Sequence, residues 1–141
     1  CGLCIMHMQG VPSTMQSQPE YQDVVAEVEH FLLERVAACR QAGIADERLV
    51  LDPGFGFGKT LAHNLELFRK LPQLGKSFPV LVGVSRKSML GAMTGKPVGE
   101  RLSASVTAAV LAAQRGAAIM RVHDVAATCD ALAVWQAIEK P

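Results

Sequence analysis

The sequence contains few aromatic residues, almost no net charge and no long apolar run. Phe, Trp and Tyr make up 5% of its 141 residues, and the formal net charge is +1 at pH 7. This balance argues against nucleic acid as a partner, because nucleic-acid-binding domains usually carry a basic face. No apolar stretch reaches the roughly 18 residues that a membrane-spanning helix needs. With 50% hydrophobic and 19% charged residues, residues 1–141 are expected to form one soluble domain.

The four cysteines do not form a recognisable metal or redox motif. Cys1 and Cys4 are spaced as C-x-x-C, but zinc would require a second such pair or an H-x3-5-H pattern, and neither occurs. Cys39 and Cys129 lie far from that pair in the sequence. We interpret all four as reduced thiols in a cytoplasmic protein and expect no metal ligands. We interpret His7, which lies between two methionines, as a core histidine satisfied by hydrogen bonds rather than a ligand.

Short apolar segments alternate with helical patterns along the chain. Val24, Val28 and Leu32 recur at helical spacing, for example, and Gly43 ends that pattern. Strands that are unbroken apolar runs and alternate with helices indicate a parallel sheet that is buried on both faces. The expected strands are residues 3–8, 49–51, 79–84 and 117–122, and the expected helices are residues 23–42, 61–74, 103–115 and 125–139, with a short helical piece before residue 101.

Four βα units fit either a small doubly wound sheet or half of an eight-stranded (β/α)8 TIM barrel. A doubly wound sheet concentrates its ligand contacts at one switch point, whereas polar or glycine residues follow every strand expected here. We therefore predict a (βα)4 half of a TIM barrel, with parallel strands and outer helices. Four strands cannot close a barrel, so two sheet edges and an apolar inner face are expected to need a cover.

The stretch DPGFGFGKT at residues 52–60 is close to a nucleotide-binding P-loop but does not match it. A P-loop requires Gly five positions before the Gly of GK, and that position is Pro53. The glycines at positions 54, 56 and 58 also fail to match G-x-G-x-x-G. We expect neither ATP nor dinucleotide binding. The glycines instead permit positive φ angles and close backbone approach.

Polar side chains follow three of the expected strands. Asp52 follows the second strand, and its carboxylate can accept two hydrogen bonds from the amidine-like edge of a guanine-like or pterin ring; a cap or turn residue is the alternative. Segment 85–88, SRKS, follows the third strand, where it forms either an anion pocket at a helix start or a solvated basic turn. Arg121 and His123 are expected on one face of the fourth strand, facing phosphate oxygens, unless Arg121 pairs with Asp124 or a core Glu.

Five segments of the sequence, taken in order, resemble bacterial dihydropteroate synthase. They are IMHMQGVP, LDPGFGFGK, LVGVSRKSMLG, GERLSASVTAAVLAAQRGA and RVHDV. The resemblance covers the C-terminal half of that enzyme, from the fifth barrel strand to the last helix. It implies an enzyme of folate biosynthesis and a target of sulfonamides. The implied reaction joins p-aminobenzoate to 6-hydroxymethyl-7,8-dihydropterin diphosphate and releases diphosphate.

The resemblance also implies which residues bind the pterin. Asp52 is similar to the residue that holds the amino-pyrimidine edge of the ring. Lys87 is similar to a lysine that contacts the pterin and borders the p-aminobenzoate site. Met6 and Gly83 match positions that line the pterin slot.

Four further positions are implied to contact the other parts of the substrates. Phe57 and Ser88 match residues that flank or bind p-aminobenzoate. Arg121 and His123 match the pair that binds diphosphate, so that Lys87, Arg121 and His123 form the implied catalytic set. In this mechanism the pterin–oxygen bond breaks first, and the neutral amine then attacks, so the protein acts mainly by electrostatic positioning.

The resemblance leaves part of the site outside this sequence. In the family, an Asn associated with Mg2+, two mobile loops and further pterin contacts belong to the first four strands. We therefore expect this chain to be inactive alone. Its expected partners are the two substrates, the N-terminal half, and a second copy bound through the C-terminal helices. The alternatives are a non-catalytic pterin- or anion-binding module and a barrel like methyltetrahydrofolate methyltransferase, although SRKS and RVHD favour the synthase.

Overall fold

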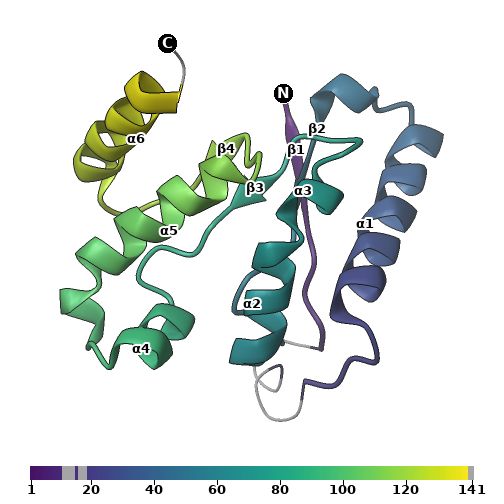
Figure 1. The fold of residues 1–141 in the computed structure, drawn as a ribbon. Helices are drawn as coiled ribbons and strands as arrows, with labels where there is room; N and C mark the ends of the chain where they lie inside the picture. The colour runs from purple at the N-terminus through teal and green to yellow at the C-terminus, as the bar shows by residue number, and fades with distance from the viewer. Residues whose placement is uncertain (11–14, 16–18, 140–141) are drawn as a thin grey trace.

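The structure, a computed structural model, describes residues 1–10, 15 and 19–139, and within them it has the predicted alternation of strands and helices. Figure 1 shows α1 beside the β1–β2 pair, and α5 and α6 beyond β3 and β4. In chain order the elements are β1 (Leu3–Met6), α1 (Val24–Gln41), the 3-10 helix η1 (Asp46–Arg48), β2 (Leu49–Asp52), α2 (Leu61–Arg69), α3 (Leu71–Leu74), β3 (Leu81–Val82), α4 (Ser88–Thr94), the 3-10 helix η2 (Val98–Glu100), α5 (Leu102–Gln114), β4 (Ile119–Met120) and α6 (Val125–Glu139).

The described strands are parallel and follow one another in chain order. Strand β1 pairs with β2, with Met6 opposite Asp52, and β3 pairs with β4. One parallel bridge between Leu51 and Val80 joins the two pairs. Because the order β1-β2-β3-β4 never reverses, the described strands lack the switch point of a doubly wound sheet. The prediction of an α/β fold with parallel strands is confirmed.

Helix α1 shows how the sequence pattern produces the packing. The side chain of Asp23 caps the helix by accepting hydrogen bonds from the backbone N–H groups of Val25 and Ala26. A row of α1 side chains at four-residue spacing is almost fully buried in the core of the molecule: Val24, Val28, Leu32 and Val36. This row packs the helix against the core of the molecule.

Two predictions of local structure are wrong. The single helix expected over residues 61–74 is interrupted at Lys70, and α3 begins afresh at Leu71. Pro72 has no N–H to donate, and its ring would clash with a carbonyl one turn earlier, so a continuous helix is disfavoured. The strands expected over residues 79–84 and 117–122 pair with each other only over Leu81–Val82 and Ile119–Met120, and Val80 adds the one bridge to Leu51. Arg121 and His123 consequently follow β4 instead of lying on it.

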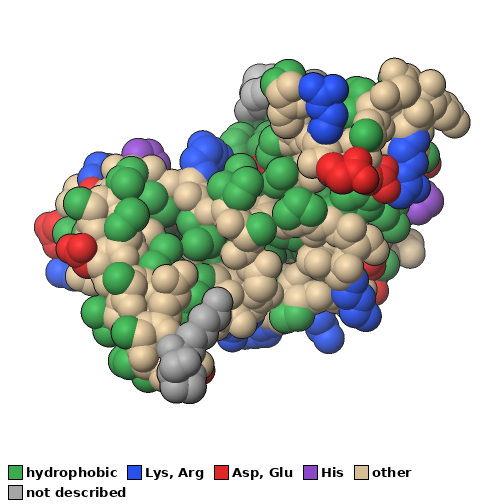
Figure 2. All heavy atoms as spheres, turned by 90° about the horizontal axis from the view of Figure 1, so that it is seen from above, with side chains coloured by type: hydrophobic (Ala, Val, Ile, Leu, Met, Phe, Trp, Pro, Cys, Tyr) green, Lys and Arg blue, Asp and Glu red, His purple; other side chains and the backbone are tan. Residues whose placement is uncertain are grey.

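Hydrophobic side chains remain exposed at both outer strands and along the C-terminal helices. Figure 2 shows such side chains spread over the face that is seen from above. The most exposed large ones on these elements are Leu3, Met6, Leu102, Leu111, Ile119, Val125, Val134 and Ile138. Within the described residues, no helix combines the length and the apolar character that crossing a membrane requires.

Candidate functional site

Asp52 occupies the last position of β2 and is only 5% exposed. Its Oδ1 accepts a hydrogen bond of 2.7 Å from the backbone N–H of Gly54. Burial raises the pKa of its carboxyl group, while that hydrogen bond and the nearby cations of Lys87, Arg121 and Lys59 act in the opposite direction. Among the described residues, none donates a hydrogen bond to Oδ2. Through Oδ1, Asp52 therefore acts as a turn residue, which was the alternative to a ligand contact.

Lys87 reaches from the loop after β3 to the loop after β2. Its Nζ donates a hydrogen bond to the carbonyl oxygen of Phe55 and lies 4.5 Å from the centre of the Phe57 ring. The pKa of Lys87 is lowered to about 8, chiefly by burial; the carboxylate of Asp52 raises this pKa and the guanidinium of Arg121 lowers it. The structure thus brings together Lys87 and Phe57, which the sequence placed thirty residues apart.

Gly83 makes room for the side chain of Arg121. A Cβ atom added at Gly83 would lie 2.8 Å from Nη2 of Arg121, so the guanidinium group lies directly against this glycine. The alternative in which Arg121 pairs with Asp124 is wrong. Asp124 instead binds Arg86, with Nε to Oδ2 at 3.1 Å and Nη2 to Oδ1 at 2.6 Å.

Two contacts join the loop after β3 to the loop after β4. The Arg86–Asp124 ion pair is one of them, and Ser85 makes the other, because its Oγ accepts a 3.2 Å hydrogen bond from His123 N–H and lies 3.1 Å from His123 Nδ1. Arg86 has a φ of 57°, an uncommon conformation for a residue other than glycine. Arg101 supports it by donating to the carbonyl oxygen of Arg86 at 2.9 Å. Segment 85–88 is therefore a braced loop and not a freely solvated turn.

The two remaining predicted residues lie at the margin of this cluster. Met6 is 37% exposed at the end of β1, opposite Asp52 in the sheet. Ser88 is the first residue of α4, as the predicted helix start requires. It lines a hollow of about 150 Å3 together with Lys59 and Asn64 from the α2 side.

Lys59 is the residue that sequence reasoning missed. Its side chain is buried, and Nζ lies 2.9 Å from His7 Nδ1 and 3.0 Å from the carbonyl oxygens of Gly54 and Phe57. Burial lowers the pKa of Lys59 to about 7 and that of His7 to about 4. The interpretation of His7 as a satisfied core histidine is confirmed. The available signal for a buried structural lysine is its position directly after a glycine-rich loop. The comparison with a P-loop uses that position only as a test for nucleotide binding.

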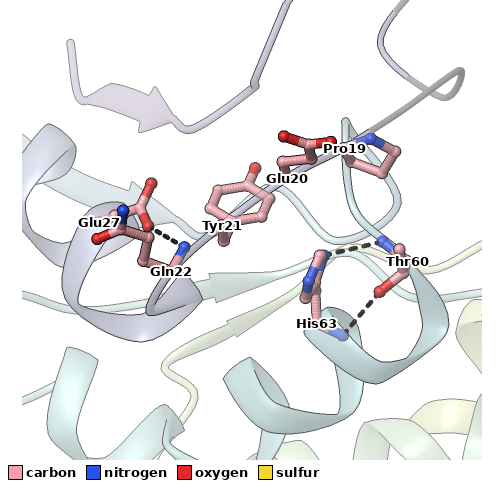
Figure 3. A pocket seen from close by; sticks show the side chains of 7 residues that line it. All are labelled: Pro19, Glu20, Tyr21, Gln22, Glu27, Thr60 and His63. Carbon is pink, nitrogen blue, oxygen red and sulfur yellow. Dashed lines mark hydrogen bonds between the residues drawn. The ribbon is translucent and has the colours of Figure 1, made fainter.

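One surface hollow is lined by residues outside the Asp52 cluster. It has a volume of about 810 Å3, and Figure 3 shows its lining. Its polar groups already bond to one another: Glu27 accepts from the N–H of Gln22, and Thr60 and His63 form a reciprocal cap at the start of α2. The strand ends therefore remain the better candidate for chemistry.

No metal-binding cluster occurs in the part of the chain that the structure describes. In particular, no three His, Cys, Asp or Glu side chains there come close enough together to hold an ion.

Comparison with known proteins gives one consistent result. Residues 1–123 match the family described as pterin binding enzyme. The dihydropteroate synthase of Neisseria meningitidis serogroup B is 56% identical over an alignment of 142 positions, and the match covers 97% of this chain and 50% of that relative. That of Escherichia coli K12 is 53% identical over 136 residues, covering 96% of this chain and 48% of the relative.

Solved structures agree with the sequence matches and imply a fold of the TIM-barrel type. Dihydropteroate synthase from Stenotrophomonas maltophilia superimposes with a TM-score of 0.95 at 52% identity, covering 99% of this chain and 53% of that one. The Xanthomonas albilineans enzyme in complex with 7,8-dihydropteroate gives 0.91 at 51% identity, covering 99% and 51%. The chain spans about half the length of the curated relatives it matches. It belongs to the pterin-binding enzyme family and is similar to the dihydropteroate synthases within it.

Proposed function

We propose that residues 1–141 are the C-terminal half of a cytoplasmic dihydropteroate synthase barrel, its strands five to eight with their helices. Together with an N-terminal half, the chain condenses 6-hydroxymethyl-7,8-dihydropterin diphosphate with p-aminobenzoate to 7,8-dihydropteroate and releases diphosphate. The observation that carries the proposal is the convergence of Asp52, Lys87 and Arg121 at one end of the sheet. The Xanthomonas albilineans enzyme, solved with 7,8-dihydropteroate and with 4-aminobenzoic acid, supports the substrates.

Each residue of the cluster has a distinct task in this reaction. Asp52 Oδ2 accepts hydrogen bonds from the amino-pyrimidine edge of the pterin, which Met6 and Gly83 border. Arg121 and His123 hold the diphosphate and stabilise the charge that grows as the pterin–oxygen bond breaks. Lys87 lies between pterin and p-aminobenzoate, with Phe57 and Ser88 on the p-aminobenzoate side. The amine of p-aminobenzoate is neutral at pH 7, so the chain needs to orient it and not to deprotonate it.

The exposed edges of the sheet support the proposed half-barrel. An apolar groove of about 420 Å3 runs between β1 and α1, lined by residues that include Leu3, Ile5 and Phe31. A second of about 330 Å3 borders β4 and α6, where Val125 and Leu132 are among the lining residues. An N-terminal half would pair with both outer strands and cover both grooves. The family resemblance assigns any magnesium ion to that half, because the Asn associated with Mg2+ belongs to the first four strands.

Complementation tests the proposed function directly. The purified 141-residue chain is expected to show no turnover, and mixing or co-expression with the half of the Neisseria meningitidis relative that it does not match is expected to restore it. Turnover is measured as diphosphate release that depends on p-aminobenzoate. Binding of pterin diphosphate without turnover by the completed barrel would instead support a non-catalytic pterin-binding module. Full turnover by the chain alone would contradict the half-barrel.

A homodimer through the C-terminal helices is part of the proposal. Helices α5 and α6 pack on each other, yet Leu111 is 39% exposed, Val134 61% and Ile138 75%. A second copy would cover these side chains. Sedimentation equilibrium of the completed protein is expected to give a dimer, and Val134→Glu is expected to give a monomer; a wild-type monomer at high concentration would contradict this interface.

The lowered pKa of Lys87 predicts a pH-dependent affinity for the pterin diphosphate. Because its pKa lies at about 8, Lys87 is mostly charged at pH 7 and mostly neutral at pH 9. If only the charged form binds well, affinity should fall about tenfold over that interval. Calorimetry at the two pH values measures the fall. The control is Lys87→Arg, which stays charged at both pH values. Comparing the two proteins in the same buffers removes the effect of the ligand's own titration. An equal fall in affinity in both proteins would contradict the role of the Lys87 charge.

A further inference from the structure

The ammonium group of Lys59 holds three separate parts of the chain together. Lys59 is 4% exposed. Its Nζ donates to the carbonyl oxygens of Gly54 and Phe57 and meets Nδ1 of His7, which must act as acceptor when the lysine is charged. The Gly54 and Phe57 contacts close the glycine-rich loop on itself. The His7 contact ties this loop to the segment that follows β1.

Each of these contacts leads to a residue of the proposed site. Both backbone polar groups of Gly54 are hydrogen-bonded to side chains: its N–H donates to Asp52, and its carbonyl oxygen accepts from Lys59. Phe57 accepts from Lys59 through its backbone, while its ring lies beneath Lys87. The backbone N–H of His7 donates to the carbonyl oxygen of Asp52 at 3.0 Å. Lys59 thus bonds directly to the backbone of Phe57 and to that of Gly54, the residue that hydrogen-bonds Asp52. Its amino group points into the glycine-rich loop.

We propose that Lys59 is a positioning residue that sets the pterin-binding carboxylate of Asp52 and the ring of Phe57 by bonding the backbone on either side of Phe55. This inference rests on the proposed function. The mechanism assigned above does not use Lys59. A buried charge is costly unless it is fully hydrogen-bonded, so the charged form of Lys59 requires its three acceptors. In return, the lysine donates hydrogen bonds that hold the loop. Without it, the carbonyl oxygen of Phe57 loses this hydrogen bond, and that of Gly54 keeps only the N–H of Phe57 as a donor, so the loop is free to shift.

The test compares Lys59→Met with Val36→Ala in the completed barrel. Val36 is 1% exposed in the core, towards the far end of α1, so its variant reports on loss of stability alone. Lys59→Met is expected to weaken binding of the pterin diphosphate about tenfold or more in calorimetry, because small misplacements of binding groups are costly. Val36→Ala is expected to bind within twofold of the wild type at a comparable loss in Tm. Equal affinities of Lys59→Met and wild type would overturn the proposal.

A second measurement separates this inference from the proposed function. Hydrogen exchange of the Gly54 N–H, which is bonded to Asp52, needs no ligand. It is expected to become about tenfold faster in Lys59→Met and to stay unchanged in Val36→Ala; unchanged exchange in both would overturn the positioning role even if the wild type binds pterin. Faster exchange in a protein that binds no pterin would refute the proposed function alone. If Lys59→Met does not fold, His7→Phe removes one acceptor, keeps a ring of similar size, and is expected to change exchange and affinity in the same direction by about threefold.

Discussion

Replacing Asp52 with Asn is expected to weaken binding of the pterin diphosphate about 100-fold in the completed barrel. The carboxylate offers Oδ2 as an acceptor inside a site where it is 5% exposed. An Asn side chain has only one oxygen, which can face either the N–H of Gly54 or the pterin. Its NH2 group then meets a hydrogen-bond donor on the other side. A buried donor left without an acceptor costs about 1–3 kcal/mol, and the upper part of that range corresponds to about 100-fold in affinity. Calorimetry at pH 7.5 measures it.

Asp46→Asn is the matched control for this substitution. Asp46 is a partly exposed residue of η1 whose carboxylate binds Arg40 at 2.6 Å. Because η1 directly precedes β2, Asp46 lies before the start of that strand, whereas Asp52 lies at its end. The same change of charge there is expected to leave affinity within twofold of the wild type. A similar loss in both variants would mean that net charge, and not the hydrogen bonds of Asp52, governs binding.

The electrostatics around Asp52 favour an anionic ligand. Lys59 and Lys87 are each shifted towards the neutral form, first by burial and then by another cation. Lys87 and Arg121 also act on Asp52 in the direction of the charged form. One carboxylate therefore faces three basic groups. A diphosphate that entered this end of the sheet would relieve the repulsion among them, which gives a physical reason for the leaving group to bind beside the ring.

Features that depend on local pattern were predicted well from the sequence. The periodicity of α1 and the stop at Gly43 gave the helix to within one residue at each end. The position of Asp52 at the end of an apolar run gave its place at the end of β2. Such features follow from interactions over a few residues, and the sequence contains all the groups involved.

Features that depend on contacts between distant segments were not predicted. Asp124 pairs with Arg86 and not with the nearby Arg121, because the fold brings the loops after β3 and β4 together. Lys59 finds an acceptor in His7, 52 positions away. Residues 11–14 and 16–18, within the expected loop of residues 9–22, lie outside the described residues. The roles of the site residues came from a family resemblance, since neither periodicity nor spacing distinguishes a ligand contact from an ion pair.

Gly54→Ala is expected to destabilise the completed barrel by about 3 kcal/mol or more. Gly54 has a φ of +69°, a conformation that costs an alanine about 1–2 kcal/mol. In addition, a Cβ atom there would lie well under 3.0 Å from the carbonyl oxygen of His7 and 2.9 Å from its carbonyl carbon. Both atoms belong to the backbone, so relief requires the segment after β1 to move away from β2. Urea unfolding measures the change.

Gly95→Ala separates the steric part of this effect from the conformational part. Gly95 ends α4 with a φ of +70°, nearly the angle of Gly54, but nothing lies within 4 Å of its added Cβ. Its substitution is expected to cost only about 1–2 kcal/mol and to leave pterin binding unchanged. Gly54→Ala should also lose pterin affinity, because His7 N–H binds the carbonyl oxygen of Asp52 and moves with the displaced segment. Equal destabilisation by both variants would show that the close approach of His7 to the glycine-rich loop contributes nothing to stability.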